Sequence, residues 1–231
     1  MLKDFSIVIP VFNEEYNIEK LILEINKIHF DDYQYEIIFV NDASVDGTKL
    51  LLDSLNIKYK FKVVNHKNNK GQSESIRSGI KESKFSNILT LDGDGQNDPK
   101  DIPKLLTKYF ADSSLKLLGG IRRERKDTLV KKISSRLANL IRKFILKDNC
   151  DDTGCSLKIF DKSIFLKFPF FDGIHRFLPA LYKGYGHKTL FITVNHRHRS
   201  FGESKYGTFD RLKKGILDLI KVYFIIKNKK I

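Results

Sequence analysis

The chain has 231 residues, of which 41% are hydrophobic and 18 are Phe, enough to bury one large core, and its net charge is +14. Two cysteines, Cys150 and Cys155, are too few for a disulfide framework or a four-ligand zinc site, and predict free thiols in a reducing cytoplasm. No stretch reaches the ~18 uncharged apolar residues of a membrane span, and no signal peptide is expected at the start of the chain.

Up to residue 120, patterns typical of strands alternate with patterns typical of helices. In chain order the sequence predicts a strand over 5–12, a helix over 13–28, a strand over 35–40, a helix over 49–55, a strand over 61–65, a helix over 71–83, a strand over 87–92, a helix over 99–110 and a strand over 115–120. This alternation predicts an α/β fold with a mostly parallel central sheet and helices on both faces.

The pattern changes after Gly120, although no linker or repeat separates the two halves. The sequence predicts an amphipathic helix over 129–146, strands over 156–160 and 189–194, and a final helix over 209–226. Residues 1–120 carry 16 basic and 18 acidic side chains, whereas residues 121–231 carry 26 and 10. We expect a single domain, 1–231, whose second half faces a phosphorylated substrate, an anionic membrane surface or nucleic acid.

The stretch LTLDGDGQNDP, residues 89–99, ends an expected strand, where ligands of open parallel sheets bind. Two carboxylates one residue apart, Asp92 and Asp94, with glycines that let the backbone approach a ligand, suit a divalent cation that keeps positions open for phosphates. Asp98 is expected to cap the helix that begins at Pro99. The spacing does not fit a helix-loop-helix calcium site, and the chain lacks phosphate-loop, GxGxxG and GxSxG motifs.

Eight motifs taken together resemble the family 2 glycosyltransferases, and within them the polyprenyl-phosphate, dolichol-phosphate-mannose-synthase-like group. They are IPVFNEEYNI (9–18), VNDASVDGT (40–48), NKGQSESIRSG (69–79), LDGDGQNDP (91–99), GIRRERKD (120–127), DDTGCSLKIF (151–160), HRFLPAL (175–181) and RSFGESKYG (199–207). Each motif is weak alone, but their order along nearly the whole chain is specific.

The resemblance implies a GT-A type enzyme that moves a sugar, with inversion, from a UDP- or GDP-sugar to a polyprenyl phosphate. Residues 1–120 would bind the nucleotide sugar and residues 121–231 the acceptor. The implied nucleotide-binding residues are Pro10, Phe12, Glu14, Asp42 and Asp92. The implied ligands of Mg²⁺ or Mn²⁺ are Asp92, Asp94 and Gln96. The implied acceptor-phosphate residues are Arg122, Lys131, Ser135, Arg199, Ser204 and Lys205. The implied catalytic residues are Asp92, Asp94, Arg122 and Arg199.

A phosphate acceptor would simplify the chemistry. Its oxygen is already ionised at neutral pH, so it needs positioning near the anomeric carbon and no general base. The protein must offset the repulsion between two anions, which a metal ion and the basic residues can do.

Simpler local interpretations compete with several of these roles. Glu14 also suits a helix N-terminus, where acids offset the macrodipole, and Asp42 suits a turn. For the other basic residues between 121 and 147, a solvated helix face is the default expectation. His175 and Arg176, at the start of an expected helix, suit packing as well as a site.

Two other functions stay open. A family 2 enzyme that glycosylates a sugar hydroxyl in surface polysaccharide synthesis needs a carboxylate base, for which the candidates are Asp151, Asp152 and Asp172. A basic nucleic-acid-binding module fits the isoelectric point of ≈ 9.6. We do not expect nucleic acid as a partner, because the basic half lacks a stacking platform and a reader motif.

The final helix, in KKGILDLIKVYFIIKNKKI, has an apolar side broken by Asp218 and Lys221. We expect it to pack on the domain or to lie in the headgroup region, where Lys227, Lys229 and Lys230 favour an anionic surface. The expected location is cytoplasmic, with peripheral attachment to the inner face of the cell membrane as an alternative.

Overall fold

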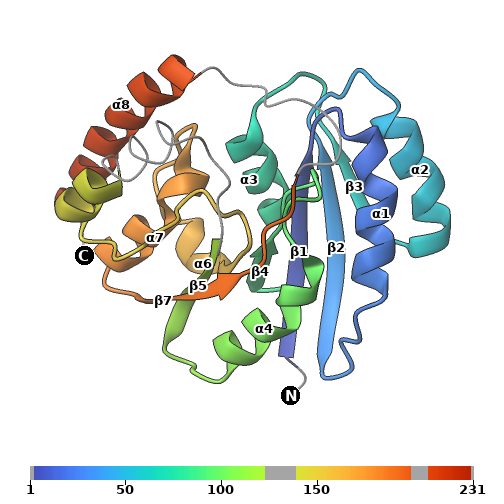
Figure 1. Cartoon of the computed structure of the whole chain (residues 1–231), viewed down its shortest axis with the longest axis horizontal. Coiled ribbons are helices and arrows are strands. Elements are labelled where there is room, and N and C mark those ends of the chain that lie inside the picture. Colours follow the sequence, from blue (N-terminus) through green and yellow to red (C-terminus); the bar gives the residue numbers. More distant parts are fainter. Residues whose placement is uncertain (1–2, 123–138, 199–207, 230–231) are drawn as a thin grey trace.

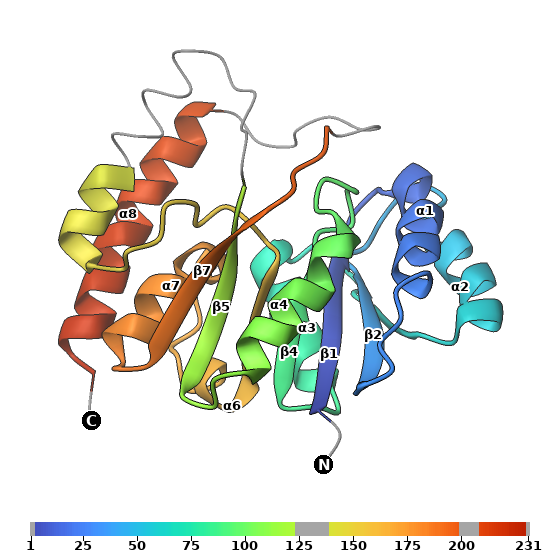
Figure 2. The same ribbon diagram turned by 60° about the horizontal axis from the view of Figure 1, so that its bottom comes forward.

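The computed structural model describes residues 3–122, 139–198 and 208–229, with the backbone alone over 208–213. Its centre is one seven-stranded sheet with the order β3-β2-β1-β4-β6-β5-β7 (Figures 1 and 2). The strands are β1 Lys3–Val11, β2 Tyr33–Asn41, β3 Lys62–Asn65, β4 Asn87–Thr90, β5 Leu115–Arg122, β6 Lys158–Asp161 and β7 Lys188–Val194. Every pair is parallel except those of β6, which runs antiparallel to β4 and to β5. The predicted mostly parallel sheet is confirmed.

The helices of the first half occur where the sequence predicts them. The described helices are α1 Glu15–Asn26, α2 Thr48–Tyr59, α3 Gln72–Glu82, the short 3₁₀ turn η1 Pro99–Asp101, α4 Ile102–Phe110, α6 Lys162–Phe165, α7 Ile174–Gly184 and α8 Thr208–Lys227. The sequence did not predict α6, and α2 continues four residues beyond its predicted end at 55. Of the helix predicted over 129–146, residues 139–146 are described and are helical.

Helices cover both faces of the sheet because neighbouring residues of a strand point to opposite faces. Ile7 and Ile9 of β1 pack in a cluster with α1 and α4, whereas Val8 between them packs in a second cluster with α3 and α7. The same alternation holds in β6, where Ile159 belongs to the first cluster and Phe160 to the second. The sheet is therefore buried on both sides, as its near-continuous apolar strands predict.

Helix α8 is apolar on two sides. Its inner side buries Val222 in the second cluster, beside the partly buried Leu219 and Ile226. Its outer side exposes five large apolar residues: Ile216, Leu217, Ile220, Tyr223 and Phe224. The helix 139–146, drawn in yellow, lies beside α8 in both views (Figures 1 and 2). Among the described helices, none combines the length and apolarity that a bilayer crossing requires.

Candidate active site

The carboxyl ends of β1, β2 and β4 meet at one edge, because β1 pairs in parallel with both neighbours. The turns there are tied together: the Asn13 backbone N–H donates to Ser44 Oγ at 2.9 Å, and the Glu14 N–H donates to Thr48 Oγ1 at 2.9 Å. Asn13 itself has φ of 55°, a left-handed conformation that asparagine tolerates. These bonds fix the loop that follows β1 against the loop that follows β2.

Asp42, after β2, is buried and already engaged by its own chain. Its carboxylate accepts hydrogen bonds from the backbone N–H groups of Lys70 and Gly71, both at 2.8 Å, and lies 2.7 Å from His66 Nδ1. The second His66 nitrogen is 2.9 Å from Ser78 Oγ. Asp42 thus holds the turn that leads into α3, a segment distant in the chain from the turn after β2 that its local interpretation assigned to it. Its role in a nucleotide pocket stays a prediction.

Three of the other four predicted nucleotide-binding residues lie around the end of β1, and the fourth, Asp92, lies beyond β4. Pro10 and Phe12 are half-buried there, and Glu14 is buried. The Glu14 carboxylate accepts a hydrogen bond from Asn17 Nδ2 at 2.7 Å, within the first turn of α1, and makes no N-terminal cap. The Asp42 N–H bonds to the Val11 carbonyl at 2.9 Å, so the structure brings this group together. Their contact with a nucleotide remains a prediction.

Asp92 and Asp94 lie beyond β4 in a turn shaped by two glycines. A Cβ on Gly93 would stand 2.5 Å from Val11 Cγ1, so only glycine lets this turn rest on the end of β1. Gly95 has φ of 73°, a conformation that glycine adopts without strain. Gln96 donates its N–H to Asp94 Oδ1 at 3.0 Å, which closes the turn around the second carboxylate.

Asp92 is held from α3 by a residue that the sequence did not single out. Gln72 Nε2, in the first turn of α3, donates to Asp92 Oδ1 at 2.8 Å. The Asp92 N–H donates to Asn97 Oδ1 at 3.3 Å, and Asn97 is itself held by Ser156 Oγ at 2.5 Å. Gln72 lies in the motif NKGQSESIRSG, but no local pattern distinguishes a side chain that turns toward a strand end from one that faces water.

The electrostatics of this turn fit a divalent cation. Burial, and after it the charge of Asp94, raise the pKa of Asp92 to about 6, although Ser156, Lys158 and Arg122 act in the opposite direction. A cation between the two carboxylates would offset the repulsion from Asp94 and favour the ionised form of Asp92. In the described part of the chain no group of three or more His, Cys, Asp or Glu side chains is arranged to hold a metal ion by itself. The two carboxylates therefore suit an ion that takes its remaining ligands from phosphates, water or Gln96.

Asp98 caps the turn η1, as predicted, because its carboxylate accepts the Lys100 N–H at 3.0 Å. It also accepts a hydrogen bond from Arg197 Nη2 at 2.5 Å, and Arg197 reaches Glu24 at 2.6 Å with its other terminal nitrogen. The segment after β7 is thereby attached to the acidic turn.

Arg122 ends β5 and is held by Asp152. Its Nε and Nη2 donate to the two oxygens of Asp152 at 2.6 and 2.7 Å, a bidentate ion pair with both side chains largely buried. Burial alone lowers the pKa of Arg122, but the hydrogen bonds and charge of Asp152 outweigh it and raise this pKa overall. The charge of Arg122 lowers the pKa of Asp92, and the charge of Asp92 raises that of Arg122. Both residues lie at the edge of the sheet where β4 and β5 end, because both strands run antiparallel to β6.

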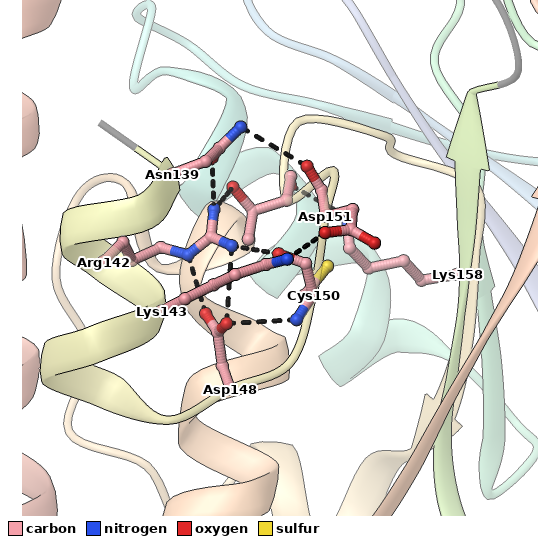
Figure 3. A network of polar contacts seen from close by, with 8 residues as sticks. Asn139, Arg142, Lys143, Asp148, Cys150, Asp151 and Lys158 are labelled. Carbon is pink, nitrogen blue, oxygen red and sulfur yellow. Dashed lines mark hydrogen bonds and ion pairs between the residues drawn. The ribbon is translucent and has the colours of Figure 1, made fainter. Parts of the chain in front are cut away.

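The other predicted acceptor-phosphate residues lie outside the described residues: Lys131, Ser135, Arg199, Ser204 and Lys205. The solvated face expected for basic residues of 121–147 is wrong at Arg142. Its side chain is buried and donates to Asp148 at 2.7 Å, and also to the Thr153 hydroxyl and the Cys150 carbonyl (Figure 3). The sequence offers no signal for this, because the partners follow the helix and enclose Arg142 only once their loop has folded back.

Lys158 is a second buried cation that the sequence did not single out. Its ammonium donates to the backbone carbonyls of Thr153 and Cys155, and its charge lowers the pKa of Asp92. The available signal was a lysine in the middle of the apolar strand SLKIF. A lysine so placed must find internal acceptors, because burying an unpaired ammonium is costly.

The three candidate bases are each paired with a cation. Asp152 holds Arg122, Asp151 pairs with Lys143, and Asp172 pairs with Lys214. Asp151 and Asp172 are exposed.

His175 lies in the first turn of α7, and its Nδ1 forms a hydrogen bond of 2.7 Å with Ser73 Oγ. Burial and the positive charges of Arg176 and Lys158 lower the pKa of His175 to about 3, so it is neutral at physiological pH. The predicted helix start at this position is confirmed, and these contacts favour packing.

A mostly parallel sheet with one antiparallel strand and an acidic turn beyond β4 describes a glycosyltransferase of the GT-A type. The family model described as "Glycosyl transferase family 2" matches residues 6–171. The chain belongs to glycosyl transferase family 2, and the resemblance seen in its motifs is confirmed.

Two curated relatives cover nearly the whole chain. The dodecaprenyl-phosphate galacturonate synthase of Rhizobium johnstonii is 35% identical over 236 residues, which span 98% of this chain and 68% of the relative. The undecaprenyl-phosphate 4-deoxy-4-formamido-L-arabinose transferase of Yersinia pestis is 33% identical over 222 residues, 95% of this chain and 67% of the relative.

Solved structures confirm the fold. The glucosyl-3-phosphoglycerate synthase of Mycobacterium tuberculosis, in complex with Mn²⁺, UDP and phosphoglyceric acid, superimposes with a TM-score of 0.72. The superposition covers 99% of this chain and 80% of the synthase chain, at 16% sequence identity. The same enzyme in complex with Mg²⁺ and UDP gives a TM-score of 0.71, also at 16% identity. Similarity at this level establishes the shared architecture alone.

Proposed function

We propose that this enzyme transfers a sugar from a nucleoside diphosphate sugar to a polyprenyl phosphate, with inversion at the anomeric carbon. Two observations support it: the named acceptors of relatives 35% and 33% identical to the chain, and the opposition of charges at the sheet edge. The second carries the proposal. The carboxylates of Asp92 and Asp94 suit a cation that binds the donor diphosphate. Arg122 suits the phosphate of the acceptor.

In this proposal Asp92, Asp94 and Gln96 would hold Mg²⁺ or Mn²⁺, and the ion would supply positive charge for the departing diphosphate. Gln72 fixes the orientation of Asp92 through its 2.8 Å hydrogen bond. The nucleotide occupies the edge next to β1 and β2, lined by Pro10, Phe12, Glu14 and Asp42. Residues 1–120 thus serve the donor.

Residues 121–231 serve the acceptor in the same proposal. Arg122 attracts its phosphate, together with Lys131, Ser135, Arg199, Ser204 and Lys205. The acceptor oxygen is ionised at neutral pH, so positioning replaces proton abstraction. Burial raises the pKa of Asp172, but the hydrogen bond and charge of Lys214 outweigh it and lower this pKa overall, so Asp172 is a weaker base for a sugar hydroxyl. Asp152 and Asp151 are engaged in ion pairs with Arg122 and Lys143. These pairs favour a phosphate acceptor, which needs no base.

The test is an assay of nucleoside diphosphate release. The protein is incubated with a panel of UDP- and GDP-sugars, a short polyprenyl phosphate, and Mg²⁺, Mn²⁺ or a chelator. We expect release that requires the polyprenyl phosphate and the metal ion, and an inverted glycosyl phosphate as product. Release with a free saccharide in place of the lipid phosphate would instead establish transfer to a hydroxyl group.

We further propose that the enzyme works at the surface of an anionic membrane. The helix 139–146 exposes Leu140, Ile141, Phe144 and Ile145, and Phe144 is 85% exposed. The neighbouring helix α8 exposes five more large apolar residues, and we propose that the two sets form one apolar face (Figures 1 and 2). Exposed lysines flank it at positions 147, 221 and 227. This combination suits the headgroup region of a bilayer, where the acceptor lies.

Flotation with vesicles of neutral and anionic phospholipids tests this location. Phe144→Ser and Phe224→Ser are each expected to weaken vesicle binding about 10-fold, because each removes an aromatic side chain that the bilayer would bury. Ile57→Ser is the matched control: Ile57 is 83% exposed on α2, at the opposite side of the molecule (Figure 1). Equal binding by all three variants, or self-association of the wild type without vesicle binding, would rule out the membrane face.

A further inference from the structure

We propose that Asp152 is a positioning residue, which holds the guanidinium of Arg122 toward the acceptor phosphate and away from the cation site. This inference rests on the proposed function, because it assumes that Arg122 receives an anion. It gives Asp152 a different role from that of a general base.

The geometry of the pair is specific. Asp152 receives Nε and Nη2 of Arg122 at 2.6 and 2.7 Å, and it also accepts the Arg122 backbone N–H at 3.2 Å. One carboxylate thereby fixes both the backbone at the end of β5 and one edge of the guanidinium. Because the guanidinium is planar and rigid, fixing that edge also fixes the direction of Nη1.

The loop that carries Asp152 is shaped around the guanidinium. A Cβ on Gly154 would stand 3.0 Å from Arg122 Nη2 and 3.6 Å from Asp152 Oδ1. Glycine at this position therefore lets the arginine lie flat against the loop. The motif DDTGCS supplies both the carboxylate and the space for its partner.

Two buried cations brace this loop from either side. Arg142 donates to the Asp148 carboxylate, the Cys150 carbonyl and the Thr153 hydroxyl, and Figure 3 shows its guanidinium at the centre of these bonds. Lys158 donates to the carbonyls of Thr153 and Cys155. Asp152 lies between these anchored residues, so its carboxylate has little freedom to move.

A fixed position of Asp152 matters because a second carboxylate, that of Asp92, also attracts the Arg122 guanidinium. Asp92 attracts the guanidinium, and its neighbour Asp94 adds a second negative charge. An arginine without Asp152 would turn toward this pair and occupy the place proposed for the metal ion. Asp152 thereby keeps the Arg122 guanidinium, which we propose binds the acceptor phosphate, away from the carboxylates of Asp92 and Asp94.

The test compares Asp152→Asn, Arg122→Met and the double variant. The asparagine amide presents N–H groups to the guanidinium, so we expect Asp152→Asn to raise the KM for the polyprenyl phosphate about 30-fold. It should also weaken Mn²⁺ binding, measured by calorimetry, about 10-fold, because the released arginine competes for Asp92 and Asp94. In the double variant Mn²⁺ affinity should return to the wild-type value.

This rescue distinguishes positioning from general damage, because a second substitution does not repair a misfolded loop. Gly154→Ala provides a variant that removes no polar group: we expect a several-fold higher acceptor KM, unchanged Mn²⁺ affinity and a similar Tm. Asp112→Asn is the matched control, since it breaks the ion pair with Lys188 just before β5, away from Arg122.

Three results would overturn the inference: wild-type Mn²⁺ affinity in Asp152→Asn, no rescue in the double variant, or a loss confined to kcat as expected for a base. The acceptor KM of Arg122→Met alone tests the proposed function separately. If that KM is unchanged, the acceptor role of Arg122 fails, whereas the Mn²⁺ measurements still decide the role of Asp152.

Discussion

The turns after β2 and β4 carry the same kind of residue to the same edge of the sheet, yet they differ in how its charge is satisfied. Asp42 accepts two backbone N–H groups and contacts His66, so its own chain satisfies it. Asp92 accepts a side-chain hydrogen bond from Gln72, and burial together with the charge of Asp94 raises its pKa to about 6, against the opposing charges of Lys158 and Arg122. The contrast separates an aspartate whose charge is held by backbone N–H groups from one whose charge is opposed by its surroundings.

The largest expected effect is on the turn after β4. Asp92→Asn should lower transfer by at least about 10³-fold, because a metal ligand and its charge are lost. The apo variant should at the same time be more stable than the wild type at pH 8, by roughly 1 kcal/mol, since a buried charge and its repulsion with Asp94 disappear. Nucleoside diphosphate release and thermal unfolding measure the two quantities. A less stable variant would contradict the comparison.

Asp42→Asn should behave in the opposite way. We expect the free energy of unfolding to fall by about 2–3 kcal/mol, because a buried carboxylate loses charge-assisted hydrogen bonds to Lys70, Gly71 and His66. Mn²⁺ affinity should stay within about twofold of the wild type at a temperature where the variant is folded. Urea unfolding and calorimetry check both statements, and an unchanged stability would show that Asp42 is not a structural residue.

The pH dependence follows from the raised pKa of Asp92. Between about pH 4 and pH 6 the folded apo protein binds more protons at Asp92 than the unfolded chain does, so its stability falls as the pH rises through this range. A metal ion must displace that proton, so Mn²⁺ affinity should rise about 10-fold per pH unit up to about pH 6 and then level off. Calorimetry at pH 5, 6 and 7 tests this, and a flat profile would show that Asp92 is ionised throughout.

The smallest expected effect lies at the end of the same turn. Asp98→Ala should lower the free energy of unfolding by about 1 kcal/mol, because the turn η1 loses the carboxylate that accepts the Lys100 N–H. The substitution also removes the ion pair with Arg197. Mn²⁺ affinity should change by less than about threefold, since Asp98 is already engaged by its own chain. A large loss of Mn²⁺ affinity in this variant would mean that the acidic turn depends on Asp98 for its shape.

The sequence was sufficient for the parts of the fold that local periodicity encodes. Apolar strands alternating with helical patterns predicted the parallel sheet, and turn residues at strand ends predicted the edge where Asp42 and Asp92 meet. Asp98 as a cap was predictable because its hydrogen-bond partner lies two residues away. Each of these features depends on short-range spacing.

The remaining features depend on partners distant in the chain. Gln72 meets Asp92 across 20 residues and Arg122 meets Asp152 across 30, and no periodic pattern specifies such pairs. Arg142 is predicted to lie on a solvated face because the periodicity of its own helix is the only local signal of its burial. Its acceptors lie in the loop that follows, and only the folded loop encloses it.

The reversed direction of β6 has an evolutionary consequence. The chain leaves β5 at Arg122 and re-enters the sheet at Lys158 on the same edge, so the segment between these strands begins and ends at the edge where we propose that the substrates bind. Under the proposed function, changes of length or sequence in this segment would alter the acceptor side of the site and leave the pairing of β1, β2 and β4 on the donor side intact. Acceptor preference could then diverge by changes in one segment, independently of the donor side.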